Sequence, residues 1–61
     1  MCQATIYLER GGEEKELLHD VISMERTADG WMVKPLLEPS QKVQGRIVKI
    51  DFLKHSVTLV R

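Results

Sequence analysis

The sequence has little of several residue types, and each shortage excludes a class of protein. It contains one cysteine, Cys2, so no disulfide can form within the chain. It has no stretch of about 20 apolar residues, which a membrane-spanning helix needs, and no basic segment that leads into an apolar one, as a secretory signal would have. We therefore expect a cytoplasmic protein that has no membrane partner and whose thiol stays reduced.

Net charge and aromatic side chains, the usual means of binding nucleic acid, are also scarce. Nine basic and nine acidic residues give a formal net charge of zero, so the chain as a whole is not attracted to nucleic acid or to an anionic membrane. Tyr7, Trp31 and Phe52 are the only aromatic residues. The sequence offers no pair of nucleophile and base and no glycine-rich phosphate loop, and so short a chain cannot enclose a cleft. We therefore expect that the protein is not an enzyme.

The length of 61 residues indicates one small β domain over residues 1–61. At this size folding removes only about 60% of the surface of the extended chain from water. The core is then marginal unless a disulfide, a metal or a partner subunit adds to it. Since a disulfide is excluded, we expect a metal or a partner subunit to stabilise the core.

Residues 2–9 alternate between apolar and polar side chains, which is the period of a half-buried strand. The apolar face would hold Cys2, Ala4, Ile6 and Leu8. Arg10-Gly11-Gly12 ends this strand and could turn the chain back into a second one.

The following segment, residues 13–24, fits two structures. Its apolar residues also fall at helical spacing, and its acidic start is a good helix former. A hairpin through Gly11-Gly12 would instead make residues 14–19 a strand that pairs with the first one. We favour the strand, because the other strands of so short a chain need close pairing partners.

Asp29-Gly30 is the sharpest turn signal, because this pair suits the positive φ angles of a type I′ hairpin. It would join strands at residues 21–27 and 31–37. Glu38-Pro39-Ser40 marks the next connection, since proline cannot donate to a central ladder and serine favours turns.

Two runs rich in β-branched residues complete the chain, at residues 43–52 and 56–60, with a short turn at residues 53–55. Gly45 could mark a bulge or a bend. The pattern predicts an all-β fold, a small curled antiparallel sheet or barrel of five to six short strands. Several strands carry apolar side chains on both faces, which a homodimer would bury. The alternative is that a closed barrel uses both sets at its rim.

Cys2 is the strongest candidate for a metal ligand. Removal of Met1 would put a free α-amine and a thiol on one residue, which together can chelate a divalent metal. Thiolate and deprotonated nitrogen are donors that Ni(II) accepts in a square plane, and two Cys2 residues near a dimer axis could share one ion. The alternative is that Cys2 is a small hydrophobic residue at the start of the apolar strand face.

The other conventional donors are His19 and His55, which lie far apart in the sequence and near predicted turns. Each is expected to be a solvated loop histidine. The acidic run at residues 13–16 is expected to be a charged edge that discourages aggregation.

Two other function classes remain open. Small curled sheets often bind single-stranded RNA or DNA, and five basic residues of the last third could form a stripe: Lys42, Arg46, Lys49, Lys54 and Arg61. The aromatic residues fit this less well, because Phe52 is expected in the core and Trp31 beside the hairpin turn. A protein–protein adaptor with an incidental cysteine is the other alternative.

The opening Met1-Cys2-Gln3-Ala4-Thr5-Ile6-Tyr7-Leu8, the central Asp20-Val21 and the Gly45–Leu53 and His55–Val60 segments resemble the CooT family. These are short cytoplasmic proteins associated with nickel insertion into carbon monoxide dehydrogenase. The resemblance implies a small β-barrel-like homodimer that acts as a nickel chaperone or accessory protein for a nickel-enzyme client. It also implies that Cys2 is the residue that binds Ni(II).

Overall fold

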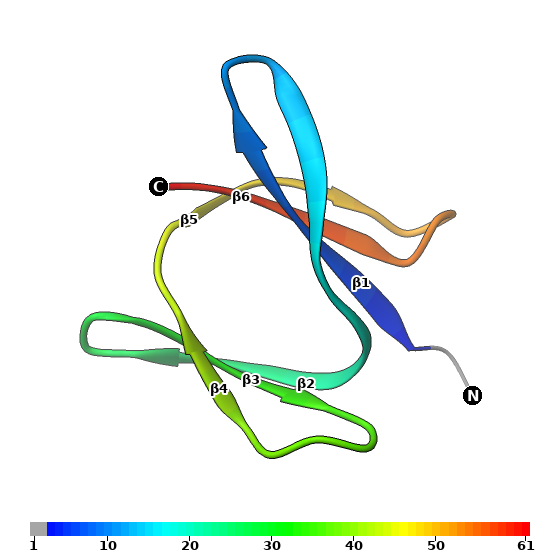
Figure 1. Ribbon diagram of the computed structural model, residues 1–61, viewed down its shortest axis with the longest axis vertical. Coiled ribbons are helices and arrows are strands. Elements are labelled where there is room, and N and C mark those ends of the chain that lie inside the picture. The colour runs from blue at the N-terminus through cyan, green and yellow to red at the C-terminus, as the bar shows by residue number, and fades with distance from the viewer. Residues whose placement is uncertain (1–2) are drawn as a thin grey trace.

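The computed structural model describes residues 3–61, and all the regular secondary structure in them is β. There are six strands: β1 (Ala4–Arg10), β2 (Glu13–Thr27), β3 (Gly30–Pro35), β4 (Gln41–Val43), β5 (Arg46–Asp51) and β6 (Ser56–Val60). Figure 1 shows them wound into one curled sheet. The predicted all-β fold is confirmed, with six strands where five to six were expected.

The sheet has the strand order β4-β3-β2-β1-β6-β5 and does not close into a barrel. It is mixed, because β1 pairs with β6 in parallel, whereas the other neighbours are antiparallel. The prediction of a wholly antiparallel sheet is therefore wrong at this pair. After β4 the chain crosses to the opposite edge, and the β5–β6 hairpin then places β6 beside β1 in the same direction.

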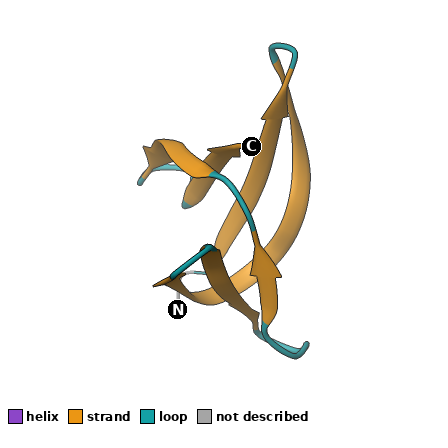
Figure 2. Cartoon of the chain, turned by 90° about the vertical axis from the view of Figure 1, so that its left-hand side faces the viewer, coloured by secondary structure: helices purple, strands orange, loops and turns teal. Residues whose placement is uncertain are grey.

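β2 is much longer than the predicted strands and serves both halves of the sheet. Its first part pairs with β1 and its last part with β3, and the register shifts between Val21 and Ser23. Just before this shift Asp20 has a φ of 53°, in the left-handed region. The strand bends here, and Figure 2 shows its curved course. The helical alternative for residues 13–24 is thus excluded. The strands expected at residues 14–19 and 21–27 form one continuous strand, β2.

The turns agree with the predictions in position but not always in type. Gly11 and Gly12 have φ angles of 60° and 83°, as a type I′ turn requires. In the β2–β3 hairpin, Thr27 pairs with Gly30, so the two loop residues are Ala28 and Asp29. Neither has a positive φ, and the type I′ assignment at Asp29-Gly30 is wrong. Gly30 instead allows a close approach, since a Cβ there would lie 2.6 Å from the carbonyl oxygen of Val43.

The predicted strand at residues 43–52 is interrupted at Gly45. This glycine has a φ of 135°, and a Cβ on it would lie 2.9 Å from the carbonyl oxygen of Val60. The indole Nε1–H of Trp31 donates a hydrogen bond of 2.9 Å to the carbonyl of Gly45. The chain therefore crosses between the two edges of the sheet at a corner that this hydrogen bond and the close approach to Val60 define.

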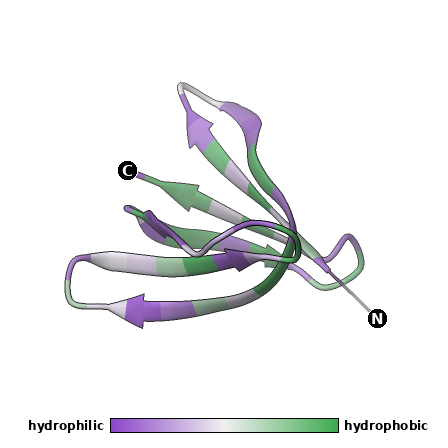
Figure 3. Ribbon diagram, turned by 60° about the horizontal axis from the view of Figure 1, so that its bottom comes forward, coloured by the Kyte–Doolittle hydropathy of each residue, from purple (hydrophilic) through white to green (hydrophobic). Residues whose placement is uncertain are grey.

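The core lies on the concave face of the sheet. Its buried apolar residues are Ile6, Val21, Val33, Val43 and Leu59. Ala4 and Leu8 pack against it, as the alternation in β1 predicts. Figure 3 shows hydrophobic and hydrophilic stretches alternating along the strands. Phe52 was expected in the core, but it is 83% exposed because β5 ends at Asp51 and Phe52 begins the following turn.

Candidate functional site

The start of β1 lies between the β5–β6 turn and the bend in β2. The backbone N–H of Thr5 donates a hydrogen bond of 2.9 Å to the carbonyl of His55, and Ala4 pairs with Val21. Cys2, the predicted metal ligand, lies outside the described residues, and Gln3 is the first residue that the structure describes. Gln3 is therefore the described residue that is nearest to Cys2 in the sequence.

A shallow depression of about 220 Å³ lies beside Gln3. Its walls come from β1, β2 and β6 and include Ile6, Ile22 and Met24, and His55 of the β5–β6 turn also lines it. Most of the lining is apolar. The structure thus brings His55 and Gln3 to the same depression, which the sequence did not indicate.

The β5–β6 turn beside this depression is well ordered by its own hydrogen bonds. A carboxylate oxygen of Asp51 accepts the backbone N–H groups of Leu53 and Lys54, each at 3.0 Å. The hydrogen bond from Lys54 is the largest of the causes that lower the pKa of Asp51 below its ordinary value. His55 closes the turn with a φ of 54°. Phe52 and Leu53 stand out from it, 83% and 92% exposed.

The β3–β4 connection reaches the same end of the sheet from the other side. The backbone N–H of Leu36 donates to the carbonyl of Asp20 at 2.8 Å, which holds the connection against the bend in β2. Lys34 Nζ donates to the carbonyl of Glu38 at 2.7 Å and closes the loop. Leu37 lies within this loop and is 90% exposed.

The two histidines differ in their surroundings. His19 lies in β2, not in a turn, and its Nδ1 is 3.0 Å from a carboxylate oxygen of Glu16. His55 lies in the β5–β6 turn, as predicted. Within residues 3–61 no three histidine, cysteine, aspartate or glutamate side chains lie close enough together to hold a metal ion. The described part of one chain therefore supplies no complete set of ligands.

The basic residues of the last third are divided between the two edges of the sheet. Lys42 lies on β4 and forms an ion pair of 2.9 Å with Asp29, which lowers the pKa of Asp29. Arg46 and Lys49 lie on β5, at the opposite edge. Trp31 is engaged within the fold, since the Arg26 guanidinium lies 5.3 Å from its ring centroid and its N–H is bonded to Gly45. This division gives the expected basic stripe little support.

Sequence reasoning missed the exposed apolar groups around the start of β1. A signal for them was present in Asp51-Phe52-Leu53-Lys54, because two large apolar residues in a predicted turn are unusual. Leu36-Leu37, just before the proline-containing connection, is a second such pair. The sequence alone does not show that these two pairs lie at the same end of the sheet, where β1 begins.

Comparison with known proteins shows the family of the chain. The family described as CO dehydrogenase accessory protein CooT has a sequence model that matches residues 1–60. The chain belongs to the CooT family. The match includes the residues before β1 as well as the whole sheet, so the resemblance seen in the sequence is confirmed over nearly all of the chain.

The fold is also that of a crystal structure assigned as CooT from Carboxydothermus hydrogenoformans. The TM-score is 0.88, and the match covers 98% of this chain and 97% of that one. The sequence identity is 20%, so this likeness supports the CooT fold alone. No protein of curated function matches the sequence. Within residues 3–61, no helix has the length and apolar character needed to cross a membrane.

Proposed function

We propose that this protein binds Ni(II) through Cys2 and serves as an accessory protein that supplies nickel to carbon monoxide dehydrogenase. The observation that carries the proposal is the match of the CooT accessory family over residues 1–60, which includes the cysteine. Nickel is here a cargo that must be bound and then released. A site at an exposed end of the sheet suits this better than an enclosed one, because the ion can reach it and leave it.

The chemistry of Cys2 supports nickel as the cargo. A thiolate with a deprotonated amine or amide nitrogen is a donor set that suits the square-planar geometry of Ni(II). One peptide bond joins Cys2 to Gln3, the first described residue, and β1 begins at Ala4. His55 lines the depression beside Gln3, and its imidazole could supply a further nitrogen donor.

The number of donors supports a site shared by two chains. Four ligands are needed for a square plane, whereas the described residues of one chain hold no group of three donors. Two copies in a symmetric homodimer would each contribute a sulfur and a nitrogen, which gives one ion per dimer. The second subunit would also add buried surface to a small core, as a domain of this size needs.

Transfer of nickel to the client tests this function. The protein is loaded with nickel, freed of excess metal and mixed with nickel-free carbon monoxide dehydrogenase in the presence of a weak chelator. We expect the wild type to restore CO oxidation and Cys2→Ser to restore no more than free nickel does. His19→Gln is the matched control, because His19 lies on β2 and bonds Glu16, and it should behave as the wild type. Equal restoration by Cys2→Ser would contradict the proposal.

A further inference from the structure

The curled sheet has two outer edges, β4 and β5, and only β5 offers an edge strand of ordinary length (Figure 1). β5 has six residues and pairs with β6 alone. Within residues 3–61, two backbone hydrogen bonds lie outside the strand pairs, and neither involves β5. The backbone N–H and C=O groups on the outer side of β5 therefore have no backbone partner in the part of the chain that the structure describes.

The other edge, β4, is protected in the way that natural sheets protect their edges. β4 has only three residues and follows Pro39-Ser40, and both a short strand and a proline hinder the addition of a further strand. Its central residue, Lys42, is held in an ion pair with Asp29. An extended segment of another protein would therefore pair more readily with β5 than with β4.

A bulge sorts the side chains of β5 between its two faces. The register with β6 shifts between Ile47 and Lys49, so Val48 is the extra residue. Side chains of a regular strand alternate, and residues three apart would then lie on opposite faces. Because of the bulge, Arg46 and Lys49 instead share one face. Ile47 and Ile50 lie on the other.

The positive charges of this edge are not neutralised by the described residues. Two ion pairs are found within residues 3–61, and neither includes a residue of β5. Arg46 and Lys49 are both exposed. The carboxylate of the strand, on Asp51, accepts two backbone N–H groups of the turn that follows. The outer strand therefore presents two cations on one face that lack a carboxylate partner among these residues.

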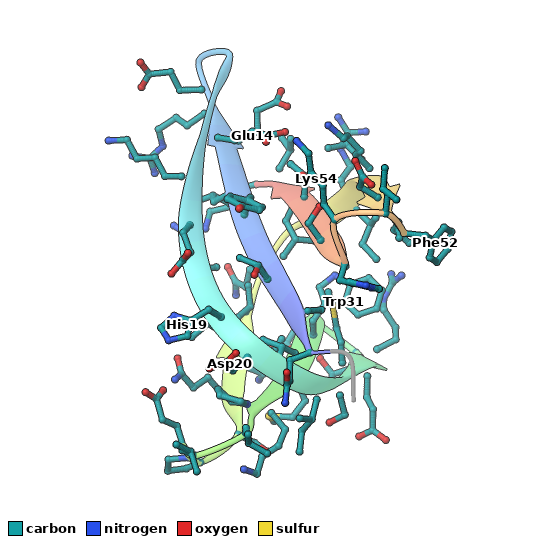
Figure 4. The ribbon with its side chains drawn as sticks, turned by 90° about the vertical axis from the view of Figure 1, so that its right-hand side faces the viewer. Glu14, His19, Asp20, Trp31, Phe52 and Lys54 are labelled. Carbon is teal, nitrogen blue, oxygen red and sulfur yellow. The ribbon has the colours of Figure 1, made fainter. Side chains whose placement is uncertain are left out.

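Apolar side chains accompany the two cations along the same hairpin. Val48 and Ile50 are 45% and 49% exposed, although both lie within a strand. The turn that follows carries Phe52, which points away from the sheet in Figure 4. Apolar surface that a folded chain keeps in water favours association with a partner that covers it.

We propose that the outer edge of β5 is the docking surface for the client, carbon monoxide dehydrogenase, and that an extended acidic segment of the client adds to the sheet as a further strand. The inference deepens the proposed function and rests on it, because it names the surface at which the accessory protein meets its enzyme. Unpaired backbone groups along a strand are complementary to an extended segment, and unpaired cations are complementary to carboxylates.

The register of β5 also defines the pattern of the segment. Cross-strand neighbours lie on the same face of a sheet. A segment that alternates acidic and apolar residues would place its carboxylates on the face of Arg46 and Lys49 and its apolar side chains on the face of Ile50. Six residues give a contact about 20 Å long, which is small for an interface. We therefore expect a transient complex, as delivery of a cargo requires.

A second copy of this chain fits the edge less well than an acidic segment does. Pairing of two β5 strands would bring two positive edges together, while the carboxylate of each is used by its own turn. A bulge and a lysine on an edge strand are features that discourage such pairing of identical edges. An acidic segment is attracted by the same cations.

Charge reversal tests the docking surface. Biolayer interferometry measures binding of the protein to immobilised nickel-free carbon monoxide dehydrogenase at physiological salt. We expect Lys49→Glu to raise the dissociation constant by about 10-fold or more, because a carboxylate then faces the acidic segment. Lys15→Glu is the matched control, since Lys15 is an exposed cation on β2 and the change in net charge is the same. It should change the constant by less than about 3-fold.

NMR spectra verify that each variant is folded, and Arg46→Glu carries the test if Lys49→Glu is not. Wild-type protein that does not bind the enzyme, or an equal effect of Lys49→Glu and Lys15→Glu, would overturn the docking surface. Sedimentation shows whether Lys49→Glu changes self-association instead. If it changes self-association and leaves binding of the enzyme intact, a second copy is the occupant and the proposal is wrong.

Two measurements test the addition of a strand. Hydrogen exchange followed by mass spectrometry should show that the enzyme slows exchange in β5 and leaves β4 unchanged, because new hydrogen bonds protect the outer amides of β5. A peptide of eight alternating glutamate and valine residues should compete with the enzyme. A peptide of alternating glutamate and proline has the same charge but cannot form a strand, and it should not compete. Equal competition by both peptides, or protection at β4 alone, would rule out strand addition at β5.

Nickel binding by the same variants separates this inference from the proposed function. Lys49→Glu should bind nickel as the wild type does and yet transfer less of it, whereas Cys2→Ser should still dock. If Lys49→Glu docks as the wild type does, the β5 surface is wrong even where nickel transfer depends on Cys2. If transfer does not depend on Cys2, the proposed function fails, and docking on β5 is judged from interferometry and hydrogen exchange.

Discussion

The backbone N–H of Thr5 is bonded to the carbonyl of His55 at 2.9 Å. This contact continues the parallel pairing of β1 with β6, which begins with Thr5 opposite Ser56. It connects the start of the chain to a turn fifty residues later in the sequence. The turn, with its two exposed apolar side chains, is thereby placed beside the end of the sheet at which Cys2 joins the described residues.

The first prediction concerns the acid sensitivity of the β5–β6 turn. Hydrogen bonds from Lys54 and Leu53 and the nearby lysine charges lower the pKa of Asp51 below 3.8. The carboxylate therefore stabilises the turn fully above this ordinary value, and the stabilisation is lost as the pH falls through the lower folded-state pKa. We expect the amide NMR signals of Leu53 and Lys54 to titrate with a midpoint below 3.8.

Asp51→Asn is the control for this titration, because it keeps an oxygen acceptor and removes the ionisable group. The same two amide signals should then be independent of pH in the acid range. A midpoint at or above the ordinary value in the wild type would contradict the hydrogen-bonded turn.

The second prediction compares two glycines. In Gly30→Ala the new Cβ would lie 2.6 Å from the carbonyl oxygen of Val43, and backbone must move to relieve it. We expect the free energy of unfolding to fall by about 2–3 kcal/mol, as in overpacked sites. Gly12→Ala meets no atom within 4 Å and carries only left-handed strain, so it should cost about 1 kcal/mol. Urea denaturation measures the free energy of unfolding of both variants. An equal loss in Gly30→Ala and Gly12→Ala would argue against the close approach of β3 and β4.

The third prediction concerns single-stranded nucleic acid. Lys42 is paired with Asp29, and Trp31 is engaged by Arg26 and Gly45, so these residues are poorly placed to bind a strand. We expect weak binding of single-stranded RNA that vanishes at physiological salt, because only scattered charges contribute. Fluorescence anisotropy measures this, and tight binding that resists salt would favour the nucleic-acid module over the nickel accessory protein.

Local patterns in the sequence predict much of the fold. The alternation around Ile6 predicts which face of β1 is buried, and the Gly11-Gly12 pair predicts the first hairpin, because both features act through neighbouring residues. The parallel pairing of β1 with β6 was not predictable in this way, since it depends on the crossover near Gly45. The exposure of Phe52 follows from the end of β5 at Asp51, which composition alone does not indicate.

The candidate site, like the fold, could be predicted from the sequence only in part. Cys2 is proposed from its position and from the family resemblance, and the structure does not describe it. The residues that line the depression beside Gln3 come from β1, β2, β6 and the β5–β6 turn, which are far apart in the sequence. Only the sheet order brings Gln3, Ile22 and His55 together, so a one-dimensional pattern could not have grouped them.

Nickel titration by calorimetry is the most direct test of the central claim, on protein whose N-terminus has been verified by mass spectrometry. We predict about half an equivalent of Ni(II) per chain, with thiolate-to-metal absorption in the near ultraviolet, because two chains share one ion. Affinity should fall as the pH is lowered, since protons compete for the thiolate and nitrogen donors. Cys2→Ser should abolish the absorption band and leave the fold unchanged. Nickel binding that is the same in Cys2→Ser, or no binding by either form, would contradict the claim.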